Sequence, residues 1–129
     1  MPSGRKNELL LHVPDNPVAV AELRRTLTEV ATDAGLSRES AFALRLAATE
    51  AVANALRHPG PAHEAVVRIR ADADGVEVEV SSDGPFRLRE DTGGSDRGRG
   101  LPLIIALMDE AKFSRDNGTT SVRLWKRAA

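Results

Sequence analysis

The chain has 129 residues, the usual size of a single domain with its own core, so we expect residues 1–129 to form one domain. Its 18 basic and 19 acidic residues leave a formal charge of -1, which argues against binding to nucleic acid or to a membrane surface. The absence of cysteine excludes disulfides, thiolate metal sites and cysteine nucleophiles. The apolar run near the N-terminus is too short for a signal peptide or a membrane span, so we expect a soluble, cytoplasmic protein.

The first elements are a strand and a helix. Residues 9–13 predict a short strand that ends at Pro14. Asn16 can then cap a helix that has Pro17 in its first turn and extends to about residue 34. Gly35 supplies the C-terminal stop of this helix. The spacing of its apolar residues gives one buried stripe, which indicates a scaffold helix.

The second helix carries the most informative pattern in the sequence. It opens near Ser37 and includes the segment 44–58, in which Glu50 and Asn54 are four residues apart. Side chains at this spacing lie on one face of a helix, together with Arg57 and His58, while apolar residues occupy the other side. A carboxylate beside a carboxamide suits a phosphate and metal site, since the amide oxygen can bind a divalent cation and the carboxylate can accept a proton. An ordinary solvated polar stripe is the alternative interpretation.

Alternating strands and turns follow the second helix. Residues 65–71 and 76–80 predict a hairpin joined through 72–75, with valines facing the core and glutamates facing water on its second strand. Residues 110–115 and 119–126 predict another hairpin, with Asp116-Asn117-Gly118 at its turn.

A polar, glycine-containing loop separates the two hairpins. The stretch 87–97 is charged, as a lid over a nucleotide would be, and Gly98-Arg99-Gly100 then opens a short helix over Leu101–Met108. Glycines before a helix allow close approach of a phosphate to free N–H groups. A glycine-rich turn without a ligand is the alternative.

The order strand, helix, helix, hairpin, loop, helix, hairpin predicts an α+β fold. We expect a two-layer α/β sandwich, with one mixed, mostly antiparallel sheet and the helices on one face. A doubly wound sheet would require strands and helices to alternate throughout, which they do not.

Four sequence blocks, in order, resemble the GHKL (Bergerat-fold) ATPases, and within them the small anti-sigma-factor serine kinases. The blocks are Glu50-Ala51-Val52-Ala53-Asn54-Ala55, Asp83-Gly84-Pro85, Gly98-Arg99-Gly100-Leu101 and Gly118-Thr119-Thr120. They span nearly the whole chain, and the order of four blocks is far more specific than any one of them.

The resemblance implies ATP and Mg²⁺ as cofactors and a role for each matching residue. Asn54 would hold the Mg²⁺ that bridges the phosphates, and Glu50 would orient or deprotonate the serine hydroxyl of a protein substrate. The backbone of Gly98, Arg99, Gly100 and Leu101 would cradle the phosphates. Gly84 would allow close approach of the adenine, and Thr119 would join its polar contacts. His58 is expected to cap its helix.

The first glycine block departs from the family pattern. The family has an acid two residues before the glycine, where it accepts a hydrogen bond from adenine, but this chain has Ser82 there. Ser82 has the same inward parity as Val78 and Val80, so we expect its side chain to occupy the position of the family's adenine-binding acid. A bulge in the strand would instead turn Asp83 inward. Phe86 replaces the second glycine of the block. A hydrogen bond to a hydroxyl is weaker than one to a charged carboxylate, so we expect the replacement by Ser82 to affect ATP affinity above all.

Two functions follow from this comparison. In the first, the chain is an ATP-dependent serine kinase that phosphorylates a small protein antagonist and otherwise sequesters a sigma factor, with homodimer formation a further expectation. In the second, it is a degenerate module of the same fold that binds a protein partner with weak or no nucleotide binding. A detached nucleotide-binding domain of a two-component histidine kinase is a third, less favoured class.

Overall fold

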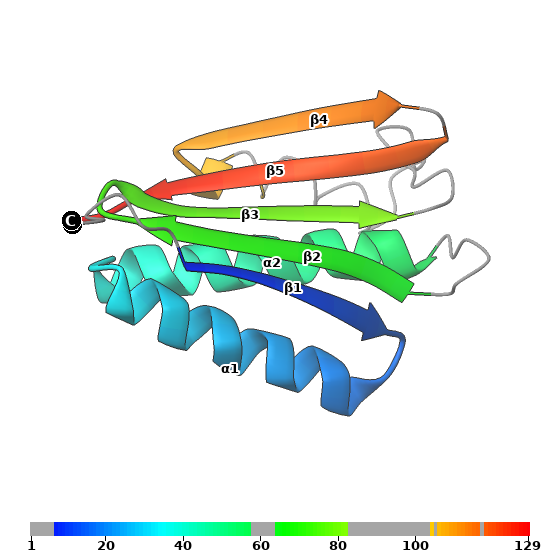
Figure 1. Cartoon of the computed structure of the whole chain (residues 1–129), viewed down its shortest axis with the longest axis horizontal. Coiled ribbons are helices and arrows are strands. Elements are labelled where there is room, and N and C mark those ends of the chain that lie inside the picture. The colour runs from blue at the N-terminus through cyan, green and yellow to red at the C-terminus, as the bar shows by residue number, and fades with distance from the viewer. Residues whose placement is uncertain (1–6, 58–63, 83–103, 105, 117) are drawn as a thin grey trace.

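The computed structural model describes residues 7–57, 64–82, 104, 106–116 and 118–129. Within these ranges the elements follow the predicted order (Figure 1), with bounds β1 Asn7–Pro14, α1 Pro17–Asp33, α2 Arg38–Arg57, β2 Glu64–Asp72, β3 Gly75–Ser82, β4 Glu110–Asp116 and β5 Thr119–Arg127. The expected bounds of all seven elements are therefore confirmed to within a few residues. Of the expected third helix, Ile104, Ala106 and Leu107 are helical, and most of the remainder lies outside the described residues.

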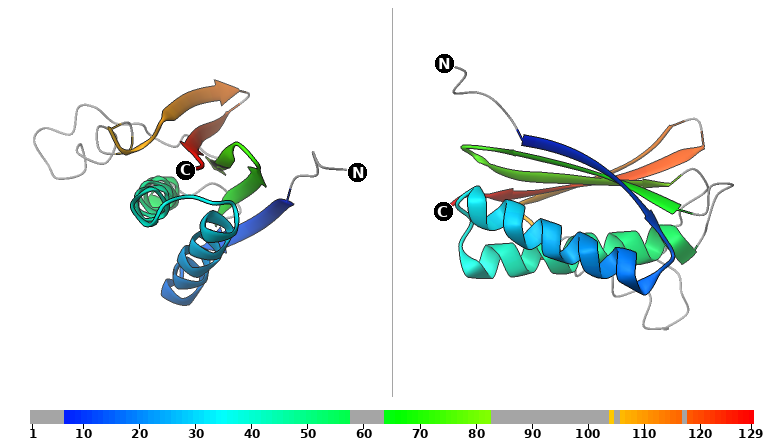
Figure 2. Two further views of the ribbon diagram at one scale, coloured as in Figure 1. Left: turned by 90° about the vertical axis from the view of Figure 1, so that its left-hand side faces the viewer. Right: turned by 60° about the horizontal axis from the view of Figure 1, so that its bottom comes forward.

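The strands form one sheet in the order β1-β2-β3-β5-β4, and the helices cover one of its faces (Figures 1 and 2). The expected α+β, two-layer class is confirmed. The four strand pairings in the described part of the chain are all antiparallel, so the expected mixture of strand directions does not occur there. Although β4 and β5 are last in the chain, β5 lies beside the central strand β3.

Helix α1 begins and ends at residues that satisfy its free backbone groups. The Asn16 side chain accepts hydrogen bonds from the backbone N–H groups of Val18 and Ala19, at 2.8 and 3.2 Å. Gly35 follows the helix with φ +89°, a conformation that glycine adopts without steric cost. The helix buries Leu23, Leu27 and Ala31. This confirms the predicted scaffold helix and its cap.

Helix α2 is amphipathic, with an alanine-rich inner side. The Ser37 hydroxyl accepts from the backbone N–H of Ser40 at 3.0 Å and so caps its first turn. Its buried residues include five alanines, whose small side chains let the helix lie close to β3 and β5; the buried set is Ala43, Leu44, Ala47, Ala48, Ala51, Val52, Ala55 and Leu56. Neither α2 nor α1 combines the length and apolar content needed to cross a bilayer, and the same holds throughout the described helical residues.

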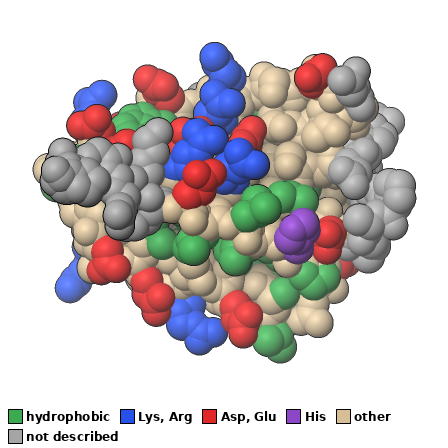
Figure 3. Space-filling view, in the orientation of Figure 1, with side chains coloured by type: hydrophobic (Ala, Val, Ile, Leu, Met, Phe, Trp, Pro, Cys, Tyr) green, Lys and Arg blue, Asp and Glu red, His purple; other side chains and the backbone are tan. Residues whose placement is uncertain are grey.

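The two faces of the sheet differ in polarity, as the alternation predicted. Val76, Val78 and Val80 are buried beneath the helices. On the opposite face, Glu77 pairs with Arg123 at 3.1 Å and with Arg70 at 3.9 Å. Figure 3 shows basic and acidic side chains intermixed on the surface. These surface pairs contribute little to stability, and their main effect is to keep this face solvated.

Candidate functional site

The functional candidates in the described part of the chain lie toward one end of the molecule. The last turn of α2, the end of β3 and the start of β5 all lie at the right-hand end of Figure 1. Antiparallel pairing of β3 with β5 produces this arrangement, because the end of one strand then lies beside the start of the other. The first sequence block lies on α2, whereas the second directly follows β3 and the fourth includes the start of β5. The fold therefore places three segments that are far apart in sequence at the same end of the molecule.

The polar stripe of α2 consists of Glu50, Asn54 and Arg57. Glu50 and Asn54 are half-buried, and Arg57 is exposed. The Arg57 Nη1 atom donates a hydrogen bond of 2.7 Å to the Asn54 amide oxygen. That oxygen is thus oriented outward from the helix, and it retains a second lone pair that can bind a cation. Glu50, Asn54 and Arg57 therefore share one face of α2, as the sequence predicted, whereas His58, the fourth residue of the predicted stripe, lies outside the described residues.

Two buried hydroxyl groups lie at the adjacent end of the sheet. Ser82, the last residue of β3, is 2% exposed, and Thr120 on β5 is 0% exposed. The two residues are direct partners in the antiparallel register. They follow the inward parity of Val80 and Val122, as the sequence predicted for Ser82. We call Ser82 and Thr120 the hydroxyl pair.

The sequence predicted that Thr119, and not its neighbour Thr120, joins the nucleotide contacts. Thr119 is half-buried and has the parity of Ser121 and Arg123, on the face away from the helices, whereas Thr120 faces inward with Val122 and Leu124. The sequence contains a signal for the inward position of Thr120, because side chains alternate along a strand and Thr120 shares the parity of Val122 and Leu124. The structure thus brings Thr120, and not Thr119, beside Ser82.

The Thr120 hydroxyl has no hydrogen-bond partner among the described residues, although it is fully buried. We therefore expect Thr120→Val to raise the free energy of unfolding of the nucleotide-free protein by about 1 kcal/mol, because an unsatisfied buried hydroxyl costs about 1–3 kcal/mol. Urea denaturation followed by circular dichroism measures this difference. Thr119→Val is the control for the same substitution on the outer face, and its effect should stay within about 0.5 kcal/mol. Equal stabilisation by both variants would contradict the assignment of an unsatisfied hydroxyl.

Several predicted site residues lie outside the described part of the chain. They are His58, Asp83, Gly84, Gly98, Arg99, Gly100 and Leu101. The segment that follows the glycine block is described where it meets β5. The Lys126 ammonium donates to the Leu107 carbonyl at 2.8 Å, and the backbone N–H of Arg127 donates to Asp109 at 2.7 Å. With Ile104 fully buried, these contacts fix the end of that segment against the sheet.

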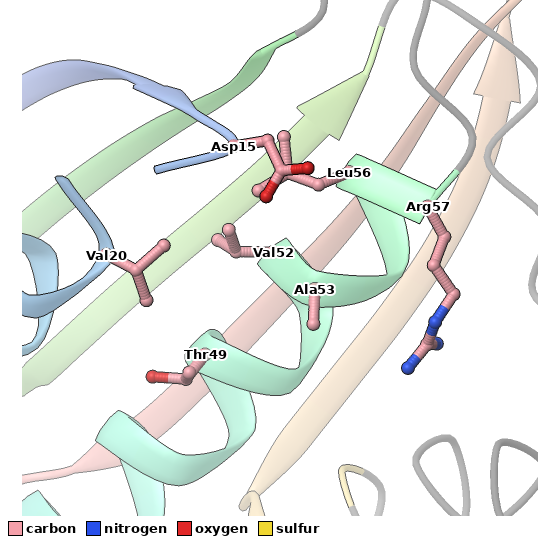
Figure 4. Close-up of a pocket in the computed structure, with 7 residues that line it drawn as sticks. All are labelled: Asp15, Val20, Thr49, Val52, Ala53, Leu56 and Arg57. Atoms are coloured by element: carbon pink, nitrogen blue, oxygen red, sulfur yellow. The ribbon is translucent and has the colours of Figure 1, made fainter. Parts of the chain in front are cut away.

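A separate pocket of about 250 Å³ lies between α1 and α2 (Figure 4). Its walls are mostly apolar, and Asp15, in the connection between β1 and α1, supplies a carboxylate. Arg57 extends away from Asp15 and Val20 in this view. Arg57 of the polar stripe lines this pocket, whereas Glu50, Asn54 and the hydroxyl pair do not. The pocket therefore adjoins the polar stripe at Arg57 without including Glu50 or Asn54.

The described residues contain no group of three or more histidine, cysteine, aspartate or glutamate side chains able to hold a metal ion. A cation at the polar stripe would need ligands beyond these described side chains, such as phosphate oxygens. The Asn54 amide oxygen is a suitable hard ligand for Mg²⁺ under that condition. The unpartnered Thr120 hydroxyl offers a polar contact for a ligand at the end of the sheet. These residues fit a nucleotide that carries its own metal.

Comparison with known proteins places this chain in a family. The model of the histidine kinase-like ATPase domain matches residues 13–126, and the chain belongs to this family. Among curated proteins it is similar to the serine-protein kinase RsbW of Listeria innocua serovar 6a, with 30% identity over 133 residues that cover 90% of this chain and 85% of the relative. RsbW of Bacillus licheniformis is 31% identical over 124 residues, covering 83% of this chain and 78% of the relative. The expected kinship with small serine kinases that have the histidine kinase-like ATPase domain is confirmed.

A solved structure has the same fold. The structure of the RsbU and RsbW domains of Rv1364c from Mycobacterium tuberculosis aligns with a TM-score of 0.72 over 94% of this chain, with 22% identity. This chain corresponds to 32% of that longer protein. At this identity the match supports the architecture of two helices on an antiparallel sheet, and it carries no assignment of individual residues.

Proposed function

We propose that the chain is an ATP-binding anti-sigma regulator that acts in the cytoplasm, phosphorylates a serine of a protein antagonist and sequesters a sigma factor when the antagonist is absent. The observation that carries this proposal is that the last turns of α2, with the polar stripe, lie at the same end of the molecule as the hydroxyl pair at the end of β3 and the start of β5 (Figure 1). The serine-kinase name of its relatives, at about 30% identity, supports the reaction class.

In this proposal the protein's residues position the reactants. Asn54 would hold Mg²⁺, Gly98, Arg99, Gly100 and Leu101 would contact the phosphates, and the hydroxyl pair, with Asp83 and Gly84 adjacent, would contact the base. Bound Mg·ATP would supply the phosphoryl group and the charge that neutralises it. Phosphoryl transfer depends mainly on positioning and charge stabilisation, so these contacts are a sufficient set.

Glu50 is the proposed base. It lies one helical turn before Asn54 on the same face of α2, so a hydroxyl held near the metal site would be within reach of its carboxylate. The Glu50 carboxylate would orient the serine hydroxyl of the antagonist and accept its proton as the serine oxygen bonds to the γ-phosphorus of ATP. The bond between that phosphorus and the ADP oxygen would break at the same time, which gives phosphoserine and ADP. Arg57, which donates to Asn54, would keep the amide oxygen turned outward.

Calorimetric titration with Mg·ATP tests the proposal. We expect the wild type to bind with a dissociation constant of about 1–100 μM, and Asn54→Ala to weaken binding at least about 30-fold, because it removes a ligand of the metal. Alanine is a better helix former than asparagine, so thermal unfolding of this variant should show an intact fold. Retention of full affinity by Asn54→Ala would remove Asn54 from the site.

One observation favours the second function, a degenerate protein-binding module. Ser82 occupies the buried, inward position at the end of β3, so the acid expected at that position is absent. The same titration separates the two functions. Absence of Mg·ATP binding at millimolar concentration, with a folded protein, would reject the kinase and leave the binding module.

A further inference from the structure

The hydroxyl pair has chemical properties that an acid at its position would not have. A carboxylate only accepts hydrogen bonds, whereas each hydroxyl can donate one and accept others, and its hydrogen rotates to suit the partner. Ser82 and Thr120 lie opposite each other on β3 and β5, and both are buried, at 2% and 0% exposure. Because water is largely excluded there, a hydrogen bond made by either hydroxyl is stronger than it would be in solvent.

The vacant hydrogen-bonding capacity lies on Thr120. Its Oγ1 atom has no partner within the described residues, and buried polar atoms in proteins almost always have one. The inward parity directs this hydroxyl toward the helix layer, on the same face as Val122. Its neutral, bifunctional character sets no preference for a donor over an acceptor on the ligand.

Adenine and guanine differ in whether they offer a hydrogen-bond donor or an acceptor. Adenine presents an amino donor where guanine presents a carbonyl acceptor, and serine or threonine can pair with either. An acid at the position of Ser82 would accept from the adenine amino group and would repel the guanine carbonyl oxygen. A hydroxyl at the same place has no such repulsion.

We propose that the hydroxyl pair makes the base site tolerant of both purines, so that this chain binds GTP about as well as ATP. The inference deepens the proposed function and rests on it, because it takes the end of β3 and the start of β5 as the place where the base lies. The specificity residue is Ser82, and Thr120 supplies the second neutral contact. The substrate class widens from adenosine to purine nucleoside triphosphates.

Calorimetry with Mg·ATP and Mg·GTP on the wild-type chain decides the proposal. We expect the two dissociation constants to agree within about fivefold, whereas a site built around a fixed acceptor discriminates by about 100-fold or more. An ATP preference of about 50-fold or more in the wild type would overturn the proposal. Failure to bind either nucleotide would reject the proposed function itself, so the two failures are distinguishable.

Two aspartate variants locate the effect. Ser82→Asp should create an ATP preference of at least about 20-fold, because a charged acceptor replaces a hydroxyl that can also donate. Ser81→Asp adds the same charge on the neighbouring residue, which pairs with Ser121 on the opposite face of β3, and should leave the wild-type ratio unchanged. An equal shift in both variants would assign the effect to net charge and overturn the role of Ser82. If Ser82→Asp does not fold, the wild-type ratio still decides the proposal.

Discussion

Replacing Glu50 by glutamine is expected to lower the rate of serine phosphorylation by about 10²–10⁴-fold, the usual contribution of a positioned general base. Glutamine has nearly the same shape and can still accept a hydrogen bond, but it cannot take up the proton of the serine hydroxyl. Mg·ATP affinity should change by less than about threefold, since the lost interaction belongs to the transition state. Phosphoserine formed on an antagonist protein from the same organism, at saturating ATP, measures the rate.

Glu29→Gln is the matched control for this experiment. Glu29 is exposed on α1, so its replacement makes the same chemical change away from the polar stripe and should leave the rate unaffected. A loss of less than about tenfold in Glu50→Gln would show that the carboxylate only orients the hydroxyl, because an amide oxygen can also do this. A variant with the wild-type rate would remove Glu50 from catalysis altogether.

Substitution of Gly75 by alanine is expected to destabilise the fold by about 3 kcal/mol, a large share of the stability of a domain of this size. An added Cβ would lie 2.3 Å from the carbonyl oxygen of Lys126 and 2.7 Å from the ring of Trp125. The Lys126 carbonyl oxygen belongs to the backbone of β5, so β3 must separate from β5 at this point to relieve the clash. Urea denaturation should show a lower midpoint with a similar slope.

Gly118→Ala is the control for glycine in a hairpin. Gly118 has φ +82°, and no heavy atom of the described residues lies within 4 Å of an added Cβ, so its replacement is expected to cost only the backbone strain of about 1–2 kcal/mol. The comparison separates steric overlap from conformational strain. If Gly75→Ala is less destabilising than Gly118→Ala, the close approach of Trp125 and Lys126 does not constrain the hairpin.

Most of the secondary structure could be predicted because its signals are local. Asn16 and Pro17 marked the start of α1, and the observed hydrogen bonds from Val18 and Ala19 are those that such a cap makes. The alternation in β3 predicted which side chains enter the core. The expectation of a mixed sheet was wrong for the described strands, since local patterns fix where strands occur and not the direction of their neighbours.

The candidate site was predictable in part. The facing of Glu50 and Asn54 follows from helical periodicity alone, and the buried position of Ser82 follows from strand parity. The choice of Thr119 over Thr120 relied on a motif, while the two-residue alternation favoured Thr120. The bond between Arg57 and Asn54 depends on the conformations of two side chains, which spacing permits but does not specify.

The sequence by itself determined the elements, their buried faces and the residue types at each block, because helix and strand periodicity, capping and turn chemistry act over a few residues. Only the tertiary structure decided that β5 lies beside β3, so that Ser82 faces Thr120 across the strands at the end where α2 presents Asn54. The physical reason is that strand pairing joins residues distant in sequence, and its register depends on how the whole inner face packs against the helices.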